Sequence, residues 1–134
     1  MKIGIAALIV FLVILGCSED YSNLPQISVD FIWLKDQTCF DERSPEITLK
    51  NVPDNTELFK IKMVDIDNNY NHGGGTFTYD GSNLIPMGAL KKYKGLCPVS
   101  FNPPRYEMRV KAIDENGNVI GFGKKFEKYP PEPE

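Results

Sequence analysis

The sequence has very few of the side chains from which zinc sites and catalytic triads are built. It contains one histidine and three cysteines in 134 residues. A structural zinc ion takes four nitrogen or sulfur ligands, and a serine hydrolase needs a histidine beside a nucleophile on a Gly-x-Ser-x-Gly turn, which is missing. We therefore predict that the protein is not an enzyme and uses no metal or other cofactor.

A basic excess is also missing. The formal net charge is -3, whereas proteins that hold nucleic acid carry dense basic patches that neutralise phosphates. The charge therefore argues against a nucleic-acid partner. After a signal segment is removed, the chain has the length of one domain, and that domain is large enough to bury a hydrophobic core without a metal.

Helical periodicity is absent beyond the N-terminal apolar run. Ten prolines and eleven glycines divide the chain into short pieces, and no window of helical length repeats its apolar residues every 3.6 positions. Residues 58–64 and 106–112 instead alternate apolar and charged side chains, as half-buried strands do, and Asn116-Gly117 predicts a hairpin turn. The sequence predicts an all-β domain with strands near 26–34, 46–49, 58–64, 76–79, 106–112 and 119–126.

What the chain does have is an export signal. Lys2 is followed by an apolar run over residues 3–15 and then by Gly16-Cys17, the pattern of a secretory signal. The run is too short to span a bilayer comfortably. Gly16-Cys17 is similar to the lipobox at which bacterial prolipoproteins are acylated and cut. The alternative is an ordinary signal peptide or signal anchor with an incidental cysteine.

The lipoprotein interpretation divides the chain into four parts. Residues 1–16 are the signal peptide, residues 17–25 a flexible tether, residues 26–130 the folded domain and residues 131–134 a disordered tail. Lipid on Cys17 would attach the protein to the outside of a bacterial membrane, in the periplasm or at the cell surface. In such an oxidising compartment Cys39 and Cys97 are expected to form a disulfide. The alternative is two free buried thiols.

A series of short motifs carries a family resemblance. They are Ser44-Pro45 before a strand, Val52-Pro53-Asp54-Asn55-Thr56, Asp65-Ile66-Asp67, Gly95-Leu96-Cys97-Pro98 and Arg105-Tyr106. In this order they resemble the phosphatidylethanolamine-binding protein family, in its bacterial Raf kinase inhibitor-like branch. The resemblance covers most of the chain after the N-terminal segment. The chain departs from the family pattern at three points: both prolines of Asp-Pro-Asp-Ala-Pro are replaced in Asp65-Ile66-Asp67-Asn68-Asn69, no Trp-His pair follows, and Pro104 stands where the family has the histidine of His-Arg-Tyr.

The resemblance implies an antiparallel β-sandwich with minor helices, here trimmed, and a binding role without catalysis. It also implies a pocket for a small anionic or phospholipid-like ligand, lined by Asp65, Asp67, His72, Cys97, Pro98 and Tyr106. Loss of the histidine before Arg105 removes a cationic donor, so we expect the pocket to be degenerate. The alternative function is a surface-mediated inhibitor or regulator of a protein partner, such as a kinase or protease.

The residues themselves leave the roles of the site open. Strand parity places Asp65 and Asp67 on the same face as Phe59, Ile61 and Met63, where carboxylates need hydrogen-bond partners. We expect donors from the loops carrying His72 or Cys97-Pro98. The alternative is a solvated strand end whose aspartates cap a turn. An EF-hand is excluded by the residues at its glycine and glutamate positions.

The sole histidine and a tyrosine also have competing interpretations. His72-Gly73-Gly74-Gly75 is either a pocket segment, a flexible hairpin tip, or an imitation of an esterase oxyanion loop. The last lacks the rest of an esterase site. Tyr106 is either a pocket wall or an ordinary core residue.

Overall fold

Short strands make up all the regular structure in this computed structural model, which describes residues 19–97 and 102–131. No helix occurs within these two ranges. The strands are β1 (Ser28–Ile32), β2 (Glu46–Lys50), β3 (Leu58–Asp65), β4 (Tyr70–Thr78), β5 (Leu84–Ile85), β6 (Lys92–Tyr93), β7 (Arg105–Ile113) and β8 (Val119–Lys128).

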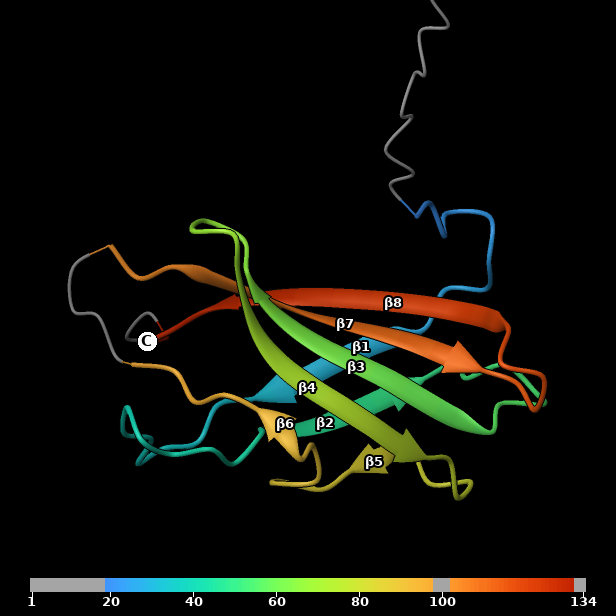
Figure 1. Ribbon diagram of the computed structural model, residues 1–134, viewed down its shortest axis with the longest axis horizontal. Coiled ribbons are helices and arrows are strands. Elements are labelled where there is room, and N and C mark those ends of the chain that lie inside the picture. Colours follow the sequence, from blue (N-terminus) through green and yellow to red (C-terminus); the bar gives the residue numbers. More distant parts are fainter. Residues whose placement is uncertain (1–18, 98–101, 132–134) are drawn as a thin grey trace, which may run out of the picture.

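The strands form two antiparallel sheets, which pack as the two layers of a β-sandwich (Figure 1). One sheet has three strands in the order β1-β2-β5, and the other has five in the order β6-β4-β3-β7-β8. The core lies between them and is drawn from both. Its fully buried side chains include Ile47 and Leu49 of the small sheet and Phe59, Met63 and Met108 of the large one. The predicted all-β sandwich is confirmed.

Alternation along the long strands explains why these segments pair. In β3 and β7 every second side chain enters the core, while Lys60, Lys62, Arg109 and Lys111 face away from it. The β7–β8 hairpin closes at the predicted turn, where Gly117 has a φ of 81°. The Asp114 carboxylate accepts hydrogen bonds from the backbone N–H groups of Asn116 and Asn118 at 3.0 and 2.8 Å.

Two expectations about this fold were wrong. The connections of the described chain contain no small helix: most are short turns with proline, glycine or asparagine, and the longest, residues 33–45, has only turns and irregular structure around Cys39. β4 begins at Tyr70 and not at Thr76, so residues 72–75 are part of a strand that pairs with β3 on one side and β6 on the other. The flexible-tip interpretation of His72-Gly73-Gly74-Gly75 is therefore excluded.

Residues 19–25 lie against the large sheet, although we expected a flexible tether there. The backbone N–H of Phe122 donates to the carbonyl of Pro25 at 3.1 Å, and the N–H of Ile27 donates to the carbonyl of Phe122 at 2.8 Å. The Tyr21 ring packs on Phe122, with centroids 5.2 Å apart. This segment therefore crosses β8 and reaches the outer face of the sheet (Figure 1).

Candidate functional site

Asp65 is the last residue of β3 and is buried, with 5% of its surface exposed. It pairs with Tyr106 of β7 on the core side of the sheet, as strand parity predicts. Its carboxylate accepts hydrogen bonds from the N–H groups of Asp67 and Asn68 at 3.0 and 2.9 Å, and from Asn68 Nδ2 at 2.8 Å. These donors come from its own turn and not from the loops of His72 or Cys97, so the predicted donor loops were wrong.

Asp67 is exposed, although strand parity predicted it on the core face with Asp65. It lies beyond the end of β3, where alternation no longer applies, and its carboxylate binds Arg105. Arg105 Nη2 and the Arg105 backbone N–H each lie 2.7 Å from an oxygen of this carboxylate. These hydrogen bonds hold the pKa of Asp67 below its usual value. The two aspartates therefore do not form a carboxylate pair.

His72 and Tyr106 do come together near Asp65. The His72 ring lies edge-on to Tyr106, with centroids 5.3 Å apart, and also contacts Tyr70. Burial lowers the pKa of His72, although the Lys94 carbonyl and the Asp65 carboxylate act in the opposite direction. Burial, with the nearby Asp65 charge, raises the pKa of Tyr106 to about 12. A neutral histidine and a neutral tyrosine therefore pack there at neutral pH.

The cysteines pair as predicted. Cys39 and Cys97 lie at disulfide distance, with Cα atoms 4.1 Å apart and 58 positions between them in the chain. Pro98, the predicted neighbour of Cys97 in the pocket, and Cys17, the predicted lipidation site, lie outside the described residues. Asp67 and Arg105 line a hollow of about 390 Å³, but Asp65, His72 and Tyr106 line none of the three main hollows of the described chain.

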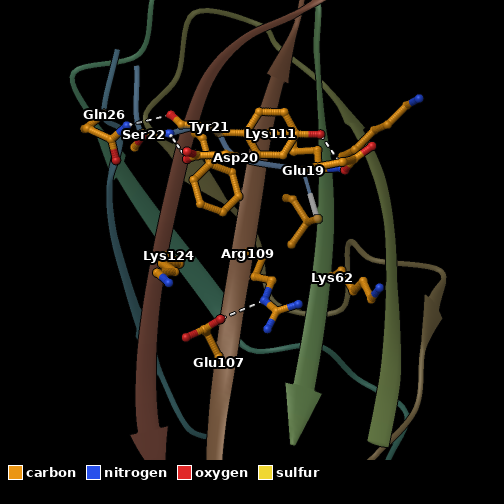
Figure 2. A pocket seen from close by; sticks show the side chains of 13 residues that line it. Glu19, Asp20, Tyr21, Ser22, Gln26, Lys62, Glu107, Arg109, Lys111 and Lys124 are labelled. Atoms are coloured by element: carbon orange, nitrogen blue, oxygen red, sulfur yellow. Dashed lines mark hydrogen bonds and ion pairs between the residues drawn. The ribbon is translucent and has the colours of Figure 1, made fainter. Parts of the chain in front are cut away.

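The largest of these hollows lies on the other side of the large sheet. This basic groove has a volume of about 780 Å³ and is bounded by the outer faces of β3, β7 and β8 and by the N-terminal segment (Figure 2). Its lining residues are Glu19, Asp20, Tyr21, Ser22, Gln26, Lys60, Ile61, Lys62, Glu107, Arg109, Lys111, Phe122 and Lys124. Five of them are cations and three are carboxylates.

Strand register concentrates the positive charge. Lys62 of β3 lies opposite Arg109 of β7, and Arg109 lies opposite Lys124 of β8, so three cations form one row across the sheet (Figure 2). The next outward-facing pair, two positions further along the strands, is Lys60 and Lys111. Like charges directly opposite each other destabilise a sheet, so the row is a surface on which an anion would relieve repulsion.

Only part of this charge is neutralised within the protein. Arg109 Nε donates to Glu107 at 2.7 Å, and Lys111 Nζ lies 2.8 Å from Glu19 Oε2. Among the residues that the structure describes, Lys60, Lys62 and Lys124 have no carboxylate within ion-pair distance. Alternation in residues 58–64 is enough to predict Lys60 and Lys62 on the solvent side of a strand, but the groove itself could not be predicted because it depends on the register between strands.

Compared with models of protein families, with curated proteins and with solved structures, the chain matches none. Over residues 19–97 and 102–131, no helix is long and apolar enough to cross a membrane. The same residues contain no group of three or more His, Cys, Asp or Glu side chains placed to hold a metal ion.

Replacing Asp65 with alanine should lower the free energy of unfolding by about 1 to 3 kcal/mol, because it leaves donors of a partly buried turn without an acceptor. Urea denaturation followed by tryptophan fluorescence measures this loss. Asp67→Ala is the matched control, since it removes a carboxylate from the same turn that binds an exposed arginine, and it should shift the midpoint less. Equal shifts for the two variants would contradict the capping role of Asp65.

Proposed function

We propose that the protein is an exported, lipid-anchored and non-catalytic binding protein that holds an anionic partner on the basic groove. The resemblance to the phosphatidylethanolamine-binding family supports the binding role, and the predicted signal peptide that ends just before Cys17 supports the anchor. The row of Lys62, Arg109 and Lys124 is the observation that carries the choice of surface.

The geometry favours this groove over the pocket inferred from the family resemblance. The acceptor capacity of Asp65 is used by its own turn, and Tyr106 packs against His72 on one side and Trp33 on another. These contacts fill the end of the sandwich with protein groups. In the groove, by contrast, Lys60, Lys62 and Lys124 offer ammonium groups, and ammonium groups bind carboxylate, sulfate or phosphate oxygens through charge-assisted hydrogen bonds.

Titration of the full-length lipoprotein in non-ionic detergent with dextran sulfate tests the proposal. We expect binding that weakens as salt rises, because salt screens exposed charges. The double variant Lys62→Gln/Lys124→Gln should bind at least about ten-fold more weakly, since it loses two charged hydrogen-bond donors.

The matched control is Lys35→Gln/Lys50→Gln, which removes two exposed lysines that do not line the groove. It lowers the net charge of the chain by the same amount and should bind like the wild type. Equal losses for the two double variants would show that net charge, and not the groove, governs binding.

A second candidate function is recognition of a protein partner through Phe40, which is 92% exposed. Phe40 lies in a turn closed by a hydrogen bond from the Asp41 N–H to the Thr38 carbonyl at 3.1 Å. The turn is fixed on one side by the Cys39–Cys97 pair and on the other by the ion pair between Asp41 and Arg43. A rigidly presented aromatic side chain is typical of interface hot spots, which suits an inhibitor or regulator.

A photo-crosslinking residue placed at position 40 should give a discrete protein adduct in the native envelope. The same residue at position 126 is the control, because Phe126 is also exposed but belongs to β8. The same protein adduct from both positions, or from neither, would contradict a specific role for Phe40.

A further inference from the structure

The N-terminal segment, from Glu19 to Gln26, lies along one side of the basic groove. Glu19 accepts from Lys111 at 2.8 Å, and the Lys111 ammonium lies 5.0 Å from the centroid of the Tyr21 ring (Figure 2). Gln26 Nε2 donates to the carbonyls of Tyr21 and Leu24 at 3.2 and 2.8 Å. The segment is therefore held against the outer face of β7 and β8 close to its described start.

This attachment limits the distance between the groove and any lipid on Cys17. Cys17 precedes Glu19 by two residues, and an extended chain covers at most about 3.6 Å per residue. The Cα atoms of Cys17 and Glu19 are thus separated by no more than about 7 Å. That is less than the screening length of about 8 Å at physiological salt. Acylation at Cys17 would therefore place the end of the groove that holds Glu19 within about one screening length of the anchor.

The same face carries the side chains that a membrane surface binds. The outer face of β8 carries Phe122, Lys124 and Phe126. Their partners on β7 are, in the same order, Lys111, Arg109 and Glu107. Phe126 is 52% exposed. Lysines mixed with exposed aromatic rings are typical of surfaces that lie on anionic lipid, where the cations meet headgroups and the rings enter the interface.

The opposite side of the sandwich has a different character. The charged side chains on the outer face of the small sheet are Asp30, which is ion-paired with Lys125 of β8, Glu46 and Lys50. This face therefore lacks a positive row, and an anionic surface would not attract it in preference to the large sheet.

From these observations we infer that the outer face of the five-stranded sheet docks on the anionic phospholipid headgroups of the membrane that holds Cys17. The inference rests on the proposed anchor and groove and names the partner of that groove. Lipid on Cys17 fixes the distance of the domain from the membrane, and the basic row fixes its orientation. Each lysine near an anionic surface contributes about five-fold in affinity, so Lys60, Lys62 and Lys124 together are enough to favour one orientation.

The test is a lysine footprint on the full-length lipoprotein reconstituted in vesicles. One set contains only phosphatidylcholine, and the other also contains phosphatidylglycerol. A water-soluble acetylating reagent with mass-spectrometric readout measures the modification rate of each lysine. We expect Lys60, Lys62 and Lys124 to react at least about five-fold more slowly on the anionic vesicles, and Lys35 and Lys50 to react equally on both. High salt should remove the difference.

A variant and a second measurement keep the outcomes apart. In Lys62→Gln/Lys124→Gln, Lys60 should react at nearly the same rate on both vesicles. Equal rates in the wild type would overturn the docking, as would a chain that does not stay with the vesicles. If the micellar protein still binds dextran sulfate in that case, the groove takes a soluble anion, and the proposed function stands without the membrane. If neither probe binds, both proposals fail.

Discussion

Replacing both Cys39 and Cys97 with alanine should lower the free energy of unfolding by about 4 kcal/mol, the largest effect we expect from removing one interaction. The two residues are 58 positions apart, so the link closes a long loop and restricts the unfolded chain strongly. The segment that carries Phe40 also packs closely against the chain just after β6. A Cβ on Gly95 would lie 1.9 Å from the Asp41 carbonyl oxygen.

Urea denaturation with and without reductant measures this contribution. The reduced wild type and the double alanine variant should unfold at the same denaturant concentration, well below the oxidised wild type. A loss under about 1 kcal/mol would contradict the long-loop argument, and so would a wild-type midpoint that reductant does not change.

Local patterns were enough to predict β3, β7 and β8 but not the full length of β4. Alternation in residues 58–64 and 106–112 assigned each side chain to the core or to solvent, and it correctly placed Asp65 on the core side. The same argument failed at Asp67, because the chain leaves the strand at Asp65 and turns. β5 and β6 have only two residues each, which is too short for any period to be visible.

The groove depends on contacts that are remote in sequence. The row of Lys62, Arg109 and Lys124 exists only because of the register between β3, β7 and β8. The contact between Glu19 and Lys111 joins residues 92 positions apart. Composition gave a net charge of -3 for the whole chain, and a net value contains no information about a local excess. A comparison of the lysine positions on the outer faces of the predicted strands would have given the earliest sign of this groove.

The glycines of residues 73–75 show how one pattern has two physical causes. A run of glycine is typical of a loose loop, but here it lies inside β4 beside the bulge at Lys62 and Val64 of β3. A Cβ built on Gly74 would lie 2.0 Å from the carbonyl oxygen of Ile61 and 3.0 Å from the Cα of Lys62. The glycine therefore permits two strands to approach closely at an irregular point in their pairing.

Gly74→Ala should accordingly lower the free energy of unfolding by at least about 3 kcal/mol, at the upper end of the cost of overpacking. The atoms in the way are backbone atoms of β3, and β3 cannot retreat without losing its pairing with β7 on its other side. Gly117→Ala is the control. A Cβ on Gly117 would meet no atom within 4 Å. The substitution there has only the unfavourable φ of 81° to overcome, which costs about 1 kcal/mol.

Chemical denaturation of the two variants separates close approach from flexibility. If residues 73–75 were a mobile tip, alanine at position 74 would be neutral or would stabilise the fold by about 0.4 to 1 kcal/mol, because it restricts the unfolded chain. A larger loss at Gly74 than at Gly117 supports the close contact between β3 and β4. Since Lys62 lies in the β3 segment that would have to move, the same variant should also weaken dextran sulfate binding to whatever fraction remains folded.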